Sequence, residues 1–233
     1  MGPVIGMIVP PAGTEVPPEA PSLWPETRFI AEGLGLERLS PEGYDAVSGK
    51  IEAAALRLAE RGATAIALMG TSLSFYRGAE WNRALVAQLK AATGLPATTM
   101  SVAIADALHA LGARKVAVGA AYGPRVNGPL RTFLESEGFE VVRLEALNIE
   151  AVEEIFRVTE DRLIALGRAA AAPEADALFL SCGGLRTLAV TAPLEAETGL
   201  PVVSSAVAGA WAAMRLAGLP ATAEGKGRLL AGA

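Results

Sequence analysis

Short, continuously apolar stretches alternate along the chain with longer stretches in which apolar residues recur every three or four positions. Continuous apolar runs without polar alternation are typical of parallel strands that are covered on both faces. The longer stretches have the period of an α-helix, and several of them end at a glycine, a common residue just beyond a helix C-terminus. The regular alternation of the two patterns predicts an α/β fold with parallel sheets.

The bounds of these elements follow from where each pattern begins and ends. The expected strands cover residues 4–9, 64–69, 97–100, 115–119, 140–144, 177–181 and 202–204. The expected helices cover residues 44–61, 79–92, 102–111, 127–137, 150–170, 185–197 and 206–216.

The chain also carries an internal repeat. The segment ATAIALMG (residues 63–70) aligns without gaps on ADALFLSC (residues 175–182), and TGLP occurs both at 93–96 and at 198–201. Each TGLP precedes a short strand, a serine and an Ala-rich helix. Any two strand-helix units look partly alike, but the shared order of several elements favours a duplicated half. In this alignment Gly70 occupies the position of Cys182.

A duplicated half predicts two pseudo-symmetric domains, each a parallel sheet flanked by helices, with the active site in the cleft between them. Residues 1–110 with about 206–233 would form the first half, and residues 111–205 the second. Open α/β sheets bind ligands at the carboxyl ends of their strands. Gly70 and Cys182 both come at the end of a predicted strand, so we expect them to face each other across the cleft.

Composition excludes several classes of function. Of the 233 residues, 52% are apolar, and the formal net charge is -5. No Lys- or Arg-rich run is present, so we expect no nucleic-acid partner. The apolar runs are too short to span a bilayer, and the first residues lack the features of a signal peptide. The single cysteine excludes an internal disulfide and fits a reducing compartment. We therefore expect a cytoplasmic protein with no membrane partner.

Cys182 is the main candidate for a reactive group. A lone cysteine is most often a small buried hydrophobic residue. Two features favour a catalytic role: the thiol lies at the end of a predicted strand, and Gly183 and Gly184 follow it. Such a turn exposes backbone N–H groups beside the thiol, and the N-terminus of the helix expected next favours a neighbouring anion.

Three hydroxyl side chains are candidate hydrogen-bond donors to a carboxylate. Thr71 and Ser72 follow the equivalent strand of the first half, and Tyr122 follows a strand of the second. Thr71 and Ser72 are also common helix N-cap residues, and the two roles are compatible. The alternative for Tyr122 is a packed aromatic residue without a role in binding.

Other catalytic groups have little support in the sequence. His109 is the only histidine and lies on a predicted helix. An ordinary zinc site needs three or four protein ligands, which one His and one Cys cannot supply. No lysine ends a strand, and no dinucleotide fingerprint or Walker-type loop is present. We therefore expect chemistry without a metal and without a cofactor.

Several motifs make the chain recognisable. The segments GMIVPP (6–11), MGTSLSFYRG (69–78) and LSCGGL (180–185) closely resemble those of the arylmalonate decarboxylases, a family of the aspartate/glutamate racemase superfamily. The resemblance extends to GLGL (33–36), PEGYDAV (41–47) and TGLP (93–96), and so runs through most of the chain. Racemases of the superfamily carry a cysteine in each half. This chain keeps only Cys182, with Gly70 in the other place.

The resemblance implies a cofactor-independent decarboxylation of 2-aryl-2-substituted malonates to enantiopure 2-arylalkanoic acids. Loss of CO2 leaves an enediolate, whose charge must be stabilised as it forms. By resemblance, Thr71, Ser72, Tyr122 and the amide of Gly183 make up a dioxyanion hole. Cys182 would protonate one face of the enediolate, and the other face, beside Gly70, would have no acid. We expect Cys182 to rest as the thiol.

By resemblance, the departing carboxylate lies in a hydrophobic pocket, and the family precedent implies a monomer. The expected pocket residues are Pro10, Leu36, Leu39, Tyr44, Leu73, Val152 and Ile155.

Two other functions stay open. The first is an isomerase or racemase of the same superfamily that acts on another small carboxylic or dicarboxylic acid. The missing second cysteine counts against it, because proton exchange at two faces needs two acids. The second is a non-catalytic protein that binds a small acid.

Overall fold

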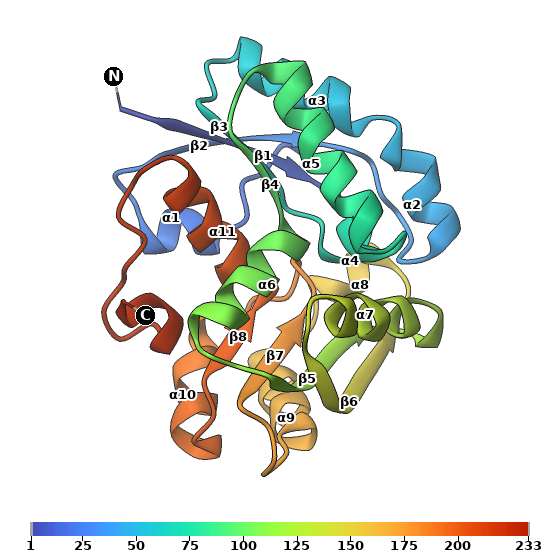
Figure 1. The fold of residues 1–233 in the computed structure, drawn as a ribbon, viewed down its shortest axis with the longest axis vertical. Helices are drawn as coiled ribbons and strands as arrows, with labels where there is room; N and C mark the ends of the chain where they lie inside the picture. Colours follow the sequence, from blue (N-terminus) through green and yellow to red (C-terminus); the bar gives the residue numbers. More distant parts are fainter. Residues whose placement is uncertain (1, 233) are drawn as a thin grey trace.

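Two fully parallel four-stranded sheets organise the molecule, in the computed structural model that describes residues 2–232 (Figure 1). The strand order is β2-β1-β3-β4 in the first sheet and β6-β5-β7-β8 in the second. If the four strands of each half are numbered along the chain, both sheets have the order 2-1-3-4. The predicted α/β class with two similar halves is therefore confirmed. The strands are β1 (Val4–Val9), β2 (Arg28–Gly33), β3 (Ala65–Leu68), β4 (Ala97–Thr99), β5 (Lys115–Tyr122), β6 (Glu140–Ile149), β7 (Ala177–Ser181) and β8 (Val202–Ser204).

Helices cover both sheets. In Figure 1, α2, α3 and α5 lie on the outer side of the first sheet, and α7, α9 and α10 surround the second. Within residues 2–232, none of the helices combines the length and apolar character that crossing a bilayer demands. The helices are α1 (Glu19–Leu23), α2 (Pro41–Ser48), α3 (Ile51–Glu60), α4 (Thr71–Phe75), α5 (Ala79–Thr93), α6 (Met100–Ala110), α7 (Pro124–Ser136), α8 (Val152–Ile155), α9 (Glu160–Ala170), α10 (Leu188–Thr198), α11 (Ser205–Leu216) and a final 3-10 turn, η1 (Arg228–Ala231).

Helices α6 and α11 connect the two halves. They pack against each other, α6 contacts β4 and β8, and α11 contacts strands of both sheets. Ten of the twelve residues of α11 are buried, and they are mostly Ala and other small residues, which allows close packing on both sides. Because these two helices contact both sheets, the division of the chain into residues 1–110 with 206–233 and residues 111–205 stays a prediction.

The structure differs from the sequence prediction at several places, of which the main ones outside the cavity follow. The sequence prediction did not include α1 or the strand β2. β2 lies at the edge of its sheet, and its six residues are mostly half-exposed, so it lacks the continuous apolar run of the other strands. The helix expected over residues 44–61 is divided into α2 and α3 at Gly49 and Lys50. The helix expected over residues 150–170 is divided into α8 and α9, where the Thr159 side chain caps α9 by accepting from the Arg162 N–H.

Strand β1 packs so closely against its neighbours that Gly6 has no room for a side chain. A Cβ at this position would lie 3.0 Å from the Ala63 Cβ and 3.1 Å from the Leu58 Cβ. Both of these atoms are bonded directly to the backbone, so they cannot move aside without it. β1 leads directly to Pro10, so its position also sets one wall of the site described below.

We expect Gly6→Ala to lower the free energy of unfolding by about 1–3 kcal/mol, the usual cost of overpacking a core. Gly49→Ala is the matched control, because nothing lies within 4 Å of the Cβ it adds and the residue already has helical dihedral angles, with φ of -66° and ψ of -10°. The control should raise stability by about 0.4–1 kcal/mol, because alanine restricts the unfolded chain more than glycine does. Urea unfolding of both variants measures the difference, and equal stability of the two would contradict the packing argument.

Candidate active site

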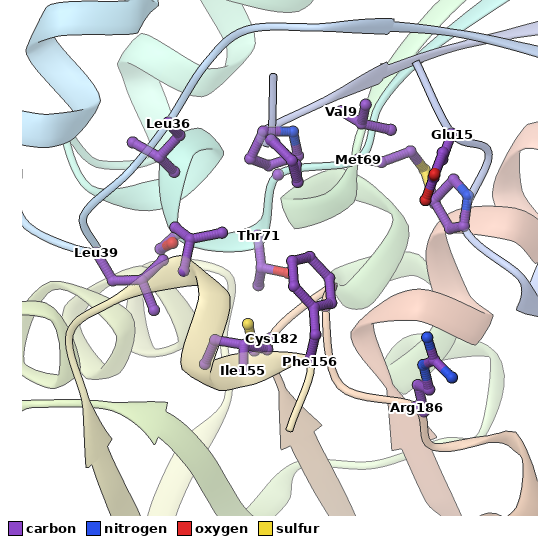
Figure 2. Close-up of a pocket in the computed structure, with 18 of the residues that line it drawn as sticks. Val9, Glu15, Leu36, Leu39, Met69, Thr71, Ile155, Phe156, Cys182 and Arg186 are labelled. Atoms are coloured by element: carbon purple, nitrogen blue, oxygen red, sulfur yellow. The ribbon is translucent and has the colours of Figure 1, made fainter. Parts of the chain in front are cut away.

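A cavity of about 500 Å³ opens between the two halves (Figure 2). Its walls come from the loop after β1, the turn after β3, the end of β5, the helix α8 and the turn after β7. The cavity therefore lies at the carboxyl ends of both sheets, where the sequence predicted it. All the predicted site residues line it except Tyr44 and Leu73.

The turns after β3 and β7 place Gly70 and Cys182 in the same cavity. Gly70 is the N-cap residue of α4, which begins at Thr71. Cys182 directly follows β7, with a φ of 157° that is uncommon for a non-glycine residue. Each turn is held by a serine that follows the short strand of its half: Ser205 accepts from the Cys182 N–H at 3.1 Å, and Ser101 donates to the Thr71 carbonyl at 3.4 Å.

The Cys182 thiol lies at the floor of the cavity and is almost enclosed. The residue is 7% exposed, and Figure 2 shows its sulfur below Thr71. Burial raises the pKa of the thiol above its ordinary value, because a thiolate would lose its hydration. The Gly184 N–H and the nearby Tyr122 hydroxyl lower the same pKa by less. The group therefore rests as a thiol, the form that was expected from the sequence.

The turn after Cys182 is longer than predicted. The expected helix over residues 185–197 begins only at Leu188, the first residue of α10. The Leu185 N–H donates to the Cys182 carbonyl at 3.2 Å and closes a tight turn instead. Cys182 is therefore followed by a loop and not by the first turn of a helix.

Met100 determines the shape of the polar side of the cavity. The Thr71 hydroxyl donates to the Met100 sulfur, with 2.7 Å between oxygen and sulfur. A thioether is a weak acceptor, so this hydroxyl can rotate towards a stronger one. A Cβ at Gly183 would lie 2.9 Å from the same sulfur and 3.1 Å from the Met69 carbonyl oxygen. Only a glycine fits at 183, and its absent side chain leaves the backbone N–H accessible.

Three buried hydroxyls near the thiol have no hydrogen-bond partner among the described residues. They belong to Tyr44, Tyr122 and Ser181. Tyr122 is completely buried. Burial, and to a smaller extent the nearby Cys182, raise the pKa of its phenol well above the ordinary value. Burial likewise raises the pKa of the Tyr44 phenol, and the nearby Ser72 hydroxyl offsets part of this rise. Unpaired buried hydroxyls cost free energy, and in native proteins they usually mark a place that a ligand or water fills.

The opposite wall of the cavity is hydrocarbon. Leu36 and Leu39 come from the first half, and Val152 and Ile155 come from α8 of the second. Backbone hydrogen bonds join the two halves here: the Leu39 N–H donates to the Glu150 carbonyl at 2.7 Å, and the Val152 N–H donates to the Glu37 carbonyl at 3.0 Å. The apolar wall is thus a rigid junction between the halves.

Gly70 is closely packed on the side of the first half. A Cβ there would lie 3.1 Å from the Leu73 Cβ and 3.2 Å from the Pro10 Cγ. Leu73 is fully buried and packs behind Gly70, which is why it does not line the cavity itself. Tyr44 is also fully buried, and its ring packs against the Tyr76 ring with 5.0 Å between centroids.

The described residues contain no cluster of three or more His, Cys, Asp or Glu side chains that could hold a metal ion.

Several lining residues were not predicted from the sequence. Some belong to a proline-rich loop between β1 and α1, and others to the ends of α8 and of the turn after β7. Val9 and Met69 lie in or at the end of predicted strands, whereas most of the other positions have no periodic pattern, so only the packing reveals them. The unpredicted lining residues are Val9, Pro11, Gly13, Glu15, Val16, Pro17, Pro18, Glu19, Met69, Phe156, Gly184 and Arg186.

Two duplicated parallel sheets, a shared cavity and a cysteine at its floor define a member of the aspartate/glutamate racemase superfamily. Within it, the chain belongs to the arylmalonate decarboxylase family, whose model matches residues 5–230. The chain is 50% identical over 230 residues to an arylmalonate decarboxylase of Bordetella bronchiseptica, which covers 97% of this chain and 96% of the relative. It is also 30% identical over 238 residues to a maleate isomerase of Nocardia farcinica (strain IFM 10152), covering 97% and 94% of the two chains.

Solved structures agree with this assignment. A liganded double mutant of arylmalonate decarboxylase, with glycine changed to cysteine and cysteine to serine, superposes with a TM-score of 0.97 at 48% identity, covering 99% of this chain and 100% of the other. A cysteine-to-serine mutant of the Nocardia farcinica maleate isomerase with a covalently bound succinylcysteine intermediate has a TM-score of 0.91 at 26% identity, covering 98% of each chain. The two halves of the fold are therefore common to both kinds of enzyme.

The raised pKa of Cys182 predicts how the thiol reacts with an alkylating reagent such as iodoacetamide. Only the thiolate reacts quickly, so labelling at neutral pH should be much slower than that of a free cysteine. The rate should rise with pH to a midpoint above about 8.5, the ordinary value. Mass spectrometry of samples labelled at increasing pH measures this midpoint, with the urea-unfolded chain as control. A midpoint in the folded protein below that of the unfolded chain would contradict the prediction.

Proposed function

We propose that this protein decarboxylates 2-aryl-2-substituted malonates without a cofactor and gives a single enantiomer of a 2-arylalkanoic acid. The observation that carries the proposal is the division of the cavity into two unlike sides: a thiol and hydroxyls on one, among them the unpaired hydroxyl of Tyr122, and hydrocarbon on the other. Membership of the arylmalonate decarboxylase family supports it independently.

The polar side binds the carboxylate that remains. The hydroxyls of Thr71, Ser72 and Tyr122 and the N–H of Gly183 act together as a dioxyanion hole. The unpaired state of the Tyr122 hydroxyl supports this role, because an acceptor in the cavity would satisfy it. As CO2 leaves, negative charge moves onto the bound carboxylate and makes an enediolate. Donors that are already oriented stabilise this charge, and each is typically worth about 3 kcal/mol of barrier.

The apolar side receives the carboxylate that departs. Between Leu36, Leu39, Val152 and Ile155 a carboxylate loses most of its hydration, whereas neutral CO2 does not depend on water. The electron pair of the breaking C–C bond passes to the α-carbon and from there to the bound carboxylate. The hydrocarbon wall thus favours the uncharged product of that bond's cleavage over the anion that precedes it.

Cys182 delivers the proton that completes the reaction. Its pKa is raised, so the thiol carries the proton that the α-carbon must gain. The thiolate left behind recovers a proton from solvent. Gly70 stands on the side of the first half, where racemases of the superfamily carry a second cysteine, so the other face of the planar enediolate meets no acid. One face is protonated, and one enantiomer results.

An isomerase acting on a small dicarboxylate is the second candidate, favoured by the 30% identity to a maleate isomerase. Gly70 counts against it, since a reaction that uses both faces of the substrate needs a thiol at each face. Parallel assays with phenylmalonate, maleate, aspartate and glutamate separate the candidates. Turnover of maleate without release of CO2 from phenylmalonate would overturn the decarboxylase proposal.

Cys182→Ser should reduce the release of product from phenylmalonate by about 10²–10⁴-fold, the usual contribution of a general acid. A serine hydroxyl fills the same space and is a far weaker acid than a thiol. Product formation is followed by chiral chromatography, and thermal unfolding checks that the variant is folded. If the folded variant kept full activity, the cysteine would have no part in proton transfer.

Gly70→Cys should permit slow racemisation of a 2-arylpropionate, because each face of the enediolate then meets a thiol. Gly70→Ala is the matched control, since it introduces the same crowding against Leu73 and Pro10 without an acid. Loss of optical purity with time distinguishes the two variants. Racemisation by both variants, or by neither although both are folded, would contradict the facing arrangement of Gly70 and Cys182.

A further inference from the structure

The open end of the cavity carries charged groups that the proposed chemistry does not use. Three ionisable side chains line it: Glu15, Glu19 and Arg186. Of the described residues that line the cavity, Arg186 alone is a cation. Figure 2 shows Glu15 and Arg186 on the side of the cavity away from Leu36 and Leu39. The charges are therefore separated from the apolar wall.

Arg186 has no carboxylate close enough for an ion pair. Its side chain is exposed, and no Asp or Glu oxygen within residues 2–232 lies within 4.0 Å of its guanidinium nitrogens. Glu19 is near enough to interact through space, but it is 4% exposed, and burial raises the pKa of its carboxyl while hydrogen bonds from its own backbone and that of Thr187 lower it. Arg186 is thus left free to bind another acceptor.

Phe156 forms an apolar platform beside this end of the cavity. It is 45% exposed, and it and Leu56 are the two large apolar side chains that the described part of the chain leaves exposed. Its ring packs over Gly184, where an added Cβ would lie 3.4 Å from the Phe156 Cε1. Figure 2 shows the ring between Thr71 and Arg186. An aromatic ring at this place can stack on a second ring that enters the cavity.

The position of a bound arylmalonate follows from the other walls. One carboxylate occupies the donors around Thr71 and Tyr122, and the other occupies the hydrocarbon wall. The aryl group must then point to the open end, where Phe156 and Arg186 lie.

We propose that Phe156 and Arg186 form an outer subsite that selects malonates whose aryl ring carries an anionic substituent, such as a ring carboxylate. Phe156 stacks on the ring, and Arg186 pairs with the substituent. This inference rests on the proposed decarboxylation and adds the class of aryl group to it. Without Arg186 the charged groups of this end would all be carboxyls, so an anionic ring would meet repulsion in place of attraction.

The test compares three substrates: phenylmalonate, (4-carboxyphenyl)malonate and the ring methyl ester of the latter. The ester retains the bulk of the substituent and removes its charge. The measured quantity is kcat/KM for the ring carboxylate divided by kcat/KM for the ester. We expect the wild-type protein to prefer the carboxylate and Arg186→Leu to lower this ratio by about two- to fivefold, as for an ion pair at a protein surface. Added salt should lower the wild-type ratio towards that of the variant.

Two further variants separate the charge of Arg186 from the stacking of Phe156. Arg157 follows Phe156 directly in the sequence, is exposed and does not line the cavity. Arg157→Leu therefore removes a nearby positive charge outside the cavity, and it should leave the ratio unchanged. Phe156→Ala should raise KM about fivefold for all three substrates, the usual size of an aromatic pair, without changing the ratio.

Each other outcome is decisive. An equal loss on all three substrates in Arg186→Leu would assign Arg186 a structural role and overturn the inference. A wild-type ratio of one, or an equal change in Arg157→Leu, would overturn it as well. An unchanged KM in Phe156→Ala would remove Phe156 from the subsite. Absence of turnover with all three substrates would overturn the proposed function and this inference together, whereas turnover of phenylmalonate keeps the function and leaves the subsite to be judged by the ratio.

Discussion

In a fully parallel sheet every strand ends at the same edge, and the site of this molecule depends on having two such sheets with their carboxyl ends turned to one cavity. The turn after β3 provides Gly70 and Thr71, and the turn after β7 provides Cys182 and Gly183. Strands buried on both faces hold these turns in place, because a strand in the middle of a sheet cannot shift without breaking hydrogen bonds on both sides. The backbone hydrogen bonds between residues 37–39 and 150–152 then fix one half against the other. Cys182 and Gly70 are thus held in one cavity by backbone pairing.

In the proposed reaction, the deep part of the cavity stabilises charge with neutral groups. Arg186, the cation that lines the cavity, lies at the open end, so the dianionic substrate of the proposed reaction would meet hydroxyls and N–H groups inside. A fixed cation would bind the carboxylates before and after bond cleavage, and such uniform binding does not accelerate a reaction. Oriented neutral donors strengthen as charge accumulates on their acceptor. The same absence of cations keeps the pKa of Cys182 high, because nothing nearby favours the thiolate enough to offset its burial.

The sequence predicts the architecture well, because the evidence for it is local. The alignment of residues 63–70 with 175–182 predicts both the duplication and the equivalence of Gly70 and Cys182, and continuous apolar runs mark seven of the strands. Strand β2 escapes prediction because its pairing with β1 is a tertiary interaction that leaves little apolar pattern. The loop that contributes Glu15 and the short helix α1 that contributes Glu19 also have little apolar pattern. Tyr44 was expected as a pocket residue, yet its ring lies behind the lining, and nothing in the sequence indicates that its hydroxyl is left unpaired.

Met100 shows why the active site needs a shaped core behind it. Its sulfur accepts from the Thr71 hydroxyl, and its contact excludes any side chain at Gly183. Its methyl group would lie 3.0 Å from a Cβ at Gly209, so the glycine of α11 makes room for it. One flexible thioether thus positions a donor from each half and depends on a helix that packs against both sheets. A branched side chain at 100 would keep the core apolar and still disturb both donors, since it could neither accept the hydroxyl nor fit the space between the two glycines. The polar cradle is therefore determined as much by apolar packing behind it as by the residues that face the substrate.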